Sequence, residues 1–334
     1  MEGIADLAEE VARFYGYNNI PVTLMRGQTT LGGYSAEQKL ENRLGALCRA
    51  FGYDEIITYS FISPACYDKL RWPSAYSARK SFQILNPLGE DTSIMRTTIL
   101  PSMLEILTRN YNYRNKAVRL YEIGKVYFAR PDGMADEPKL LCLGVYGGGM
   151  DIFQLKGAVE RILAGLRITD VTFEAEHDNP SYHPGRCAKV YAGGKLLGVL
   201  GQIHPLVAAN YGVDAELYTA ELWLGELLYA RGSTAFYTPL PRFPAVTRDI
   251  AIVCAADIPV AKLSACILAA GGQYLKGCEL FDVYTGAPIP VGYKSVAFSL
   301  TLRADDQTLT DDHAEETMQS VLKALKETFN ATIR

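Results

Sequence analysis

The chain has 334 residues, of which 49% are hydrophobic and 21% charged, and its formal net charge is −4. This length is sufficient for two domains, and the slightly acidic balance excludes a polycation that binds nucleic acid through bulk charge. The seven cysteines are scattered. Without a CxxC pair or an apolar run of membrane-spanning length, the chain is predicted to be a cytoplasmic protein with reduced thiols and no membrane contact.

The first predicted helix has an apolar stripe and an acidic flank. Its stripe consists of Ile4, Leu7, Val11 and Phe14. Gly16 ends the pattern, and residues 17–21 are expected to leave as an extended loop. The carboxylates of Asp6, Glu9 and Glu10 share one flank, a spacing that can present oxygen ligands to Mg²⁺. The residues alone favour the alternative, a solvated acidic face near the helix N-terminus.

A second helix and several short elements are predicted next. The helix begins near Ser35, and its inward face is expected to carry the apolar residues Leu40, Leu44, Leu47 and Phe51. A strand over 56–61, a helix start within 60–67 and a strand over 82–85 follow, and Asn-Pro-Leu-Gly at 86–89 predicts a turn. Arg96 is the one cation in the next loop, and we expect it to form a structural ion pair rather than to face a partner.

The stretch from 95 to 127 predicts a helix, a basic connection and a strand. Pro101 suits the first helical turn, and the strand that begins at Val118 contains Gly124 as a bend or bulge. The connection has no acid between 107 and 121 and interleaves aromatic with basic residues: Arg109, Tyr111, Tyr113, Arg114, Lys116 and Arg119. Such a segment can hold single-stranded RNA, although a solvated loop or a subunit contact is favoured.

Residues 140–224 predict the rest of a sheet. A strand over 140–146, three glycines and a helix over 152–166 outline a phosphate loop. The Lys-Ser/Thr ending that holds phosphate and Mg²⁺ is missing, so we do not expect phosphate to bind in this way. A hairpin over 187–203 turns at Gly193 and Gly194, and a last strand covers 218–224. His177 and His183 precede Cys187 without enough further ligands for a metal site.

The segment 231–244 is the clearest linker, and the elements beyond it follow the order βαββαβ of a ferredoxin-like fold with one open sheet face. Alternation points Phe281 and Val283 toward the helices. The open face then carries Asp282, Tyr284, Ser295, Ser299, Thr301, Arg303 and Arg334. These residues can stack and read an unpaired base, although residues 240–334 hold nine basic and eleven acidic residues, so bulk attraction to RNA is weak. A polar solvated sheet is the alternative.

Several ordered motifs resemble one family, the beta subunit of bacterial phenylalanyl-tRNA synthetase. They are DLAEEVARFYGYNNIP, YDEIITYSFIS, LNPLGEDTSIMRTTILPSML, NYNYRNKAVRLYEIGKVY, HPGRCAKVYAGGKLLGVLGQIHP, PRFPAVTRDIAIV and LFDVYTG. The resemblance implies an α+β fold, with a degenerate class II aminoacyl-tRNA synthetase-like antiparallel sheet core and a C-terminal ferredoxin-fold anticodon-binding domain. It divides the chain into the tail of a preceding helical domain (1–25), a non-catalytic core (26–230), a linker (231–244) and the anticodon-binding domain (245–334).

The resemblance also implies a function. In that family two alpha and two beta chains join phenylalanine to tRNA(Phe), and ATP is bound in the alpha subunit. This chain is then a C-terminal portion of the beta subunit that is inactive alone, because the Arg-x-Glu loop of motif 2 and the Gly-x-Gly-x-x-Arg of motif 3 are absent. We weigh two alternatives: a stand-alone RNA-binding paralogue without an alpha partner, and a free-standing enzyme that uses the carboxylates of the first helix with Mg²⁺.

Site residues follow from the same resemblance. The family's anticodon contacts map to Asp282, Tyr284, Ser295 and Arg334. Its magnesium ligands map to Asp6, Glu9 and Glu10, together with an upstream aspartate that precedes Met1 here. The magnesium site is therefore expected to be incomplete.

Overall fold

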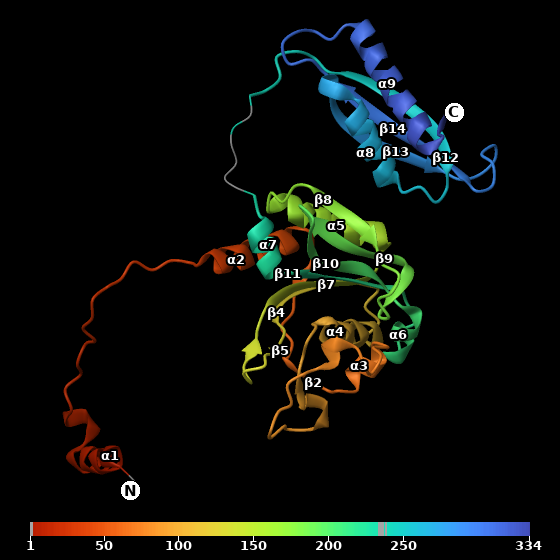
Figure 1. The fold of residues 1–334 in the computed structure, drawn as a ribbon. Coiled ribbons are helices and arrows are strands. Elements are labelled where there is room, and N and C mark those ends of the chain that lie inside the picture. Colours follow the sequence, from red (N-terminus) through yellow and green to blue (C-terminus); the bar gives the residue numbers. More distant parts are fainter. Residues whose placement is uncertain (1–2, 233–236, 238) are drawn as a thin grey trace. The chain divides into compact units, whose positions relative to one another are not determined.

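The computed structural model describes residues 3–232, 237 and 239–334 (Figure 1). The chain divides into two compact units, Met1–Thr234 and Ala235–Arg334, and each is described by itself. None of the described helices combines the length and the apolar character needed to cross a membrane.

The first unit is built on a seven-stranded sheet with the order β1-β4-β7-β11-β10-β9-β8. β1 pairs with β4 in parallel, and the other neighbours are antiparallel. The strands are β1 (Asp54–Glu55), β4 (Ala117–Lys125), β7 (Lys139–Gly147), β8 (Val171–Ala175), β9 (Tyr182–Ala192), β10 (Lys195–Ile203) and β11 (Leu217–Trp223). Two small antiparallel pairs join β2 (Phe61–Ile62) to β3 (Ile94–Met95) and β5 (Phe128–Ala129) to β6 (Ala135–Asp136).

Helices cover both faces of the large sheet (Figure 1). One face carries α2 (Ala36–Ala50), α5 (Ile152–Gly165) and α7 (Leu224–Ala230), and the other carries α3 (Cys66–Lys69), α4 (Leu100–Asn112) and α6 (Pro205–Asn210). Side chains of β7 alternate between the two cores: the first core contains Leu141, Leu143 and Val145, and the second contains Leu140, Cys142 and Tyr146. The apolar run 140–146 is therefore that of a strand buried on both faces.

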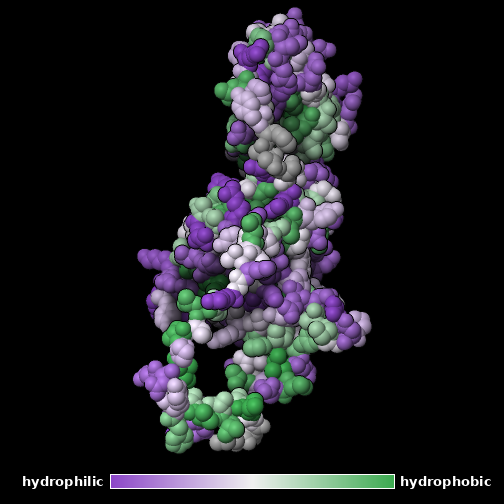
Figure 2. Space-filling view, turned by 90° about the vertical axis from the view of Figure 1, so that its left-hand side faces the viewer, coloured by the Kyte–Doolittle hydropathy of each residue, from purple (hydrophilic) through white to green (hydrophobic). Residues whose placement is uncertain are grey.

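The N-terminal helix α1 (Ile4–Tyr15) contributes to neither core, because none of its residues is buried. Gly16 ends it with φ 91°, as predicted, but a short 3-10 helix, η1 (Tyr17–Asn19), replaces the start of the expected extended loop. The predicted apolar stripe is exposed, and hydrophobic side chains gather on this helix at the lower end of Figure 2. Such a stripe is typical of a helix that packs on another apolar surface.

Two of the predicted strands are wrong. Residues 56–60 form no strand, and Ile57 and Tyr59 are 91% and 82% exposed. These two side chains therefore face solvent instead of a core. The strand expected over 82–85 is reduced to an isolated bridge between Gln83 and Ile94, and Leu85 is fully exposed.

The second unit is a four-stranded antiparallel sheet with the order β13-β14-β12-β15, which confirms the predicted ferredoxin-like fold. Its elements are β12 (Val246–Ala255), α8 (Val260–Ala270), β13 (Leu275–Tyr284), β14 (Tyr293–Leu302), α9 (Asp311–Phe329) and β15 (Thr332–Ile333). Ile252 and Phe298 share one core with Ile267 of α8 and Val321 of α9. Both helices therefore pack on the same face, and no helix among the described residues of this unit covers the other.

Candidate nucleic-acid interface

The open face of the second sheet gathers three side chains that are predicted to contact RNA. Tyr284 ends β13 and is the register partner of Ser295 on β14, so both lie on the same face. Arg334 follows β15, and its backbone N–H donates to the Ala251 carbonyl at 2.9 Å. Its Cζ atom lies 5.6 Å from the centre of the Tyr284 ring. The sheet thus unites an aromatic ring, a hydroxyl and a cation.

Ser295 differs from the prediction in its exposure. It is 3% exposed although it lies on the open face. Its register partners are Tyr284 and Val253, and the side chain of Arg334 reaches across to Tyr284. We attribute the burial of the small hydroxyl to these larger side chains. A base that stacks on this side of the tyrosine has to displace the guanidinium, a contact worth about 0.5–1 kcal/mol at exposed sites.

Phe281 lies at an irregularity of β13 that the predicted alternation did not include. Val283 pairs on the helix side as expected, but the register shifts between Leu280 and Asp282, and Phe281 has no register partner and is 58% exposed. An irregularity of this kind adds a residue to one strand and interrupts the alternation of its side chains. Asp282 keeps the predicted side because its register partner, Ala297, lies between two inward residues of β14.

Arg303 does not join this group. It follows the last residue of β14, eight positions beyond Ser295, which corresponds to roughly 26 Å along an extended strand. Its backbone N–H donates to the Tyr274 carbonyl at 2.8 Å. Its Nε atom is buried and has no hydrogen-bond partner among the described residues. The candidate interface therefore consists of Asp282, Tyr284, Ser295 and Arg334.

In the first unit, Arg96 lies in the core and is 1% exposed. Its Nη2 donates to Glu122 Oε1 at 2.7 Å, which confirms the predicted structural ion pair. Nη1 donates to Thr58 Oγ1 at 2.7 Å, and Nε donates to the Lys125 carbonyl at 3.0 Å. Gly124 makes room for this pair, because a Cβ there would lie 2.3 Å from Arg96 Nη2. Gly124 pairs with Leu140 of β7 in an unbroken register, so the bend or bulge predicted at Gly124 is wrong.

Two core carboxylates of the first unit, Glu122 and Glu221, accept hydrogen bonds from other residues of the same unit. Glu122, in the segment where the motif 2 signature is missing, is 2% exposed and also accepts from the Thr58 hydroxyl at 2.7 Å. Glu221, which the sequence interpretation missed, accepts from the Thr98 hydroxyl at 2.7 Å and from the Ile99 backbone N–H at 2.9 Å. Burial raises the pKa of Glu221. These groups hold the fold together and do not face an open ligand site.

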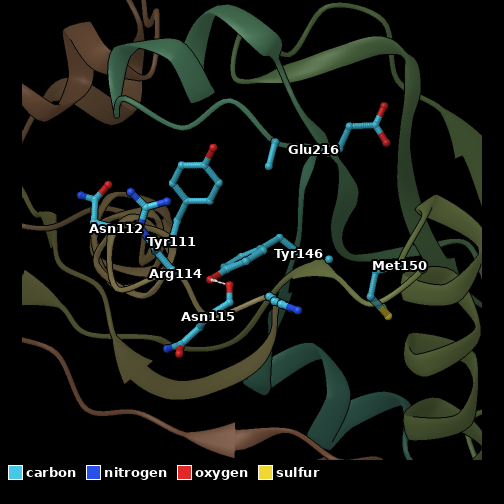
Figure 3. A pocket seen from close by; sticks show the side chains of 11 residues that line it. Tyr111, Asn112, Arg114, Asn115, Tyr146, Met150 and Glu216 are labelled. Carbon is cyan, nitrogen blue, oxygen red and sulfur yellow. Dashed lines mark hydrogen bonds between the residues drawn. The ribbon is translucent and has the colours of Figure 1, made fainter.

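A polar pocket of about 690 Å³ opens where α4 connects to β4 (Figure 3). Its walls come from the basic connection, the end of β7 with its glycine turn, and the residues that precede β11. They include Tyr111, Arg114, Lys116, Tyr146, Gly149 and Glu216. The sequence indicated the basic connection but not the pocket, because no spacing within 109–119 shows that residues 146–150 and 215–216 lie beside it.

The three carboxylates predicted as magnesium ligands do not form a metal site. Asp6 Oδ2 accepts from the Gly3 backbone N–H at 3.1 Å, and Glu10 pairs with Arg13 at 2.5 Å. No group of three or more His, Cys, Asp or Glu is placed to hold a metal ion within the described residues. Asp6, Glu9 and Glu10 therefore do not fit a magnesium ion in this structure, and they form an acidic face on α1.

Comparisons with known proteins cover both units. The family described as phenylalanyl tRNA synthetase beta chain CLM domain matches residues 20–224, and the ferredoxin-fold anticodon binding domain matches residues 241–334. The phenylalanine–tRNA ligase beta subunit of Clostridium tetani is 40% identical over 98% of this chain, and that of Moorella thermoacetica is 41% identical over 100% of it. The chain spans 42% and 43% of the length of these relatives.

Proposed function

Because the chain belongs to the family of phenylalanyl-tRNA synthetase beta chains, we propose that it serves a phenylalanine–tRNA ligase by binding the anticodon end of tRNA(Phe) and assembling with an alpha subunit. In this proposal the alpha subunit binds ATP and carries the catalytic centre, and this chain alone has no ligase activity. The cytoplasm is the proposed compartment, since all seven cysteines are free thiols, as is usual in a reducing environment.

The observation that carries the proposal is the contact of Tyr284 with Arg334 on the open sheet face. A tyrosine ring beside a guanidinium supplies a stacking surface and a phosphate partner in one place. Asp282 on the same face can accept hydrogen bonds from a base edge. This set suits an unpaired base, which is what an anticodon loop presents.

Exposed apolar side chains of the first unit support a contact with another chain. Ile57 and Tyr59 precede β2, and Leu85 and Leu88 lie between β2 and β3; all four are largely or fully exposed. Burying a large aliphatic side chain contributes about 1.5–3 kcal/mol. We expect an alpha subunit to cover these residues. Failure to co-purify with an alpha chain would favour the stand-alone RNA-binding alternative.

The anticodon role is tested with Tyr284→Ala. Loss of one stacked base costs about 1–3 kcal/mol, so the affinity for tRNA is expected to fall about five- to a hundred-fold or more. Tyr229→Ala is the matched control, because Tyr229 is an exposed tyrosine of the first unit that also has a cation, Lys195, over its ring. The measurement is tRNA affinity of the chain assembled with its alpha subunit. An unchanged affinity for Tyr284→Ala removes the anticodon role from this face.

The absence of catalysis in the isolated chain is tested by pyrophosphate exchange. We expect no exchange that depends on phenylalanine, because Glu122 is bonded within the core and the ATP-binding signatures are missing from the sequence. Exchange that persists after trace alpha subunit has been removed would contradict this part of the proposal.

A further inference from the structure

The polar pocket where α4 connects to β4 has no part in the proposed function. We propose that it binds a nucleoside phosphate, with the phosphate on Arg114 and Lys116 and the base against the ring of Tyr111. The ligand is a free nucleotide or one nucleotide of an unpaired RNA strand, which present the same chemistry. This inference goes beyond the proposed function, since it places a second nucleotide site in the first unit, separate from the anticodon face.

The cations of the pocket are available to a ligand. Arg114 and Lys116 are exposed, and their side chains have no hydrogen-bond or ion-pair partner in the described part of the chain. The acid of the opposite wall is already engaged, because Glu216 accepts from Arg186 Nη1 at 2.9 Å and from the Tyr218 hydroxyl at 2.6 Å. Figure 3 shows the Glu216 carboxylate turned away from Tyr146. Unpaired positive charge therefore faces the pocket and favours an anion.

Tyr111 offers a surface for a base. Its partly exposed ring meets the Tyr146 ring edge-on, with 6.2 Å between the centroids and 76° between the planes. Burial raises the pKa of Tyr146, and its hydroxyl donates to the Asn115 carbonyl at 2.9 Å (Figure 3). Tyr111 thus rests against a ring that is itself fixed. Stacking on such a ring tolerates any base, and the nearby amide of Asn112 can meet a base edge, whereas the Asn115 amide already donates to Asn110 Oδ1 at 2.7 Å.

The backbone of the connection is held in one conformation. Arg114 has φ 63°, in the left-handed region that residues other than glycine, asparagine and aspartate rarely adopt. Its N–H donates to the Tyr111 carbonyl at 2.9 Å. Opposite, a Cβ on Gly147 would lie 2.0 Å from the Lys116 carbonyl oxygen, so only glycine allows the two walls to approach. Arg114 directly follows the C-cap of α4, where a left-handed residue commonly ends a helix, so this conformation fixes the direction in which the connection leaves α4.

The volume of the pocket suits this ligand, and a neighbouring hollow distinguishes a free nucleotide from an RNA strand. About 690 Å³ lies within the range of roughly 300–1,000 Å³ that small-ligand sites occupy. A second hollow of about 530 Å³ shares Asn115 and Lys116 with the pocket and adds Arg119. A free nucleotide fills the first hollow only, whereas an RNA strand continues into the second. Binding of RNA is therefore expected to depend on Arg119, and binding of a free nucleotide is not.

The charge contribution is tested with the double variant Arg114→Asn/Lys116→Gln. Asparagine removes the charge and tolerates the left-handed backbone at 114. Arg26→Asn/Lys80→Gln is the matched control, because it removes the same charge from exposed residues outside the lining. The probes are AMP and an unpaired oligoribonucleotide of mixed sequence, titrated against the whole chain after thermal melting has shown that each variant is folded.

The pocket variant is expected to bind either probe at least about ten-fold more weakly, since each charge-assisted hydrogen bond contributes roughly that factor. For the oligoribonucleotide, the slope of log affinity against log salt is expected to fall by about 0.7, which corresponds to the one phosphate that Arg114 and Lys116 hold on a single strand. An equal loss in the control variant, or no binding of either probe to the unmodified chain, overturns the proposal.

The base contact is tested with Tyr111→Leu, for which stacking predicts a loss of about five- to a hundred-fold. Tyr113→Leu is its control, because Tyr113 is exposed and lies outside the lining. AMP binding that is insensitive to Arg119→Gln identifies a free-nucleotide site; oligoribonucleotide binding that Arg119→Gln weakens identifies an RNA site. An equal effect of the two tyrosine variants contradicts the base contact. Tyr284→Ala is expected to leave AMP binding unchanged. The anticodon role and the pocket are therefore tested by different variants, and either proposal can be refuted without the other.

Discussion

The buried ion pair between Arg96 and Glu122 is suited to a double-mutant cycle. Arg96→Met leaves the Glu122 carboxylate 2% exposed, with only the Thr58 hydroxyl as a remaining partner. Removing one partner of a buried pair typically costs about 3–5 kcal/mol, because the other charge stays buried and uncompensated. Glu122→Leu leaves the guanidinium in the same position and is expected to cost a similar amount.

The double variant Arg96→Met/Glu122→Leu is expected to recover much of that loss. Apolar replacements of a buried pair are often neutral or stabilising. The remaining cost comes from the carbonyl of the exposed Lys125, which loses its bond from Arg96 Nε, and from the Thr58 hydroxyl, which loses two partners. The hydroxyl is only half-buried, so water can reach it. The expected coupling energy between the two positions is therefore at least about 2 kcal/mol.

Tryptophan fluorescence during urea unfolding measures this cycle. The chain has two tryptophans, Trp72 and Trp223, and both lie in the first unit. Their signal therefore reports the free energy of unfolding of that unit without interference from the second. If the losses of the two single variants add within about 0.5 kcal/mol in the double variant, the pair is not coupled and the reasoning is wrong.

Three further outcomes are expected. Gly198→Ala should destabilise the first unit by about 1–3 kcal/mol or more, because the new Cβ would lie 1.9 Å from the Glu221 carbonyl oxygen; no loss in urea unfolding would contradict this. Gly157→Ala should stabilise by up to about 1 kcal/mol, since open space surrounds this position in α5, and a lower midpoint would refute it. The hydrogen bond from Lys189 lowers the pKa of Glu176, so its stabilisation is present above the unfolded pKa of about 4.3 and is lost as the pH falls through the folded value. In the variant Glu176→Gln, the melting temperature should therefore fall less steeply as the pH is lowered below about 4.3 than it does in the unmodified chain. An identical fall in both chains would exclude this contribution.

Long regular patterns were read correctly from the sequence. The helices α2, α4 and α5 are each more than three turns long and bury an apolar stripe, and the order βαββαβ leaves few alternatives for how the second unit packs. Arg96 was predictable as an ion pair because a single cation in an apolar segment needs a partner. These features depend on contacts that recur along one element.

Features that depend on a single irregularity or on distant segments were not predictable. The shift between Leu280 and Asp282 leaves no mark in the residue pattern, yet it leaves Phe281 without a register partner. Ile57 and Tyr59 alternate as in a strand, but pairing needs a neighbouring strand, and only two residues of β1 find one. The pocket beside Arg114 joins three segments that only the sheet register brings together.

The alternation of β7 between two cores has a consequence for cooperativity. Its backbone hydrogen bonds to β4 and β11 can be exposed only when the helices on both faces have separated from the sheet. Hydrogen exchange at its amides therefore requires opening of the whole first unit, and we expect these amides to be its slowest. An insertion of one residue at Leu141 would send every following side chain into the opposite core. The length of β7 is thus fixed by both cores at once.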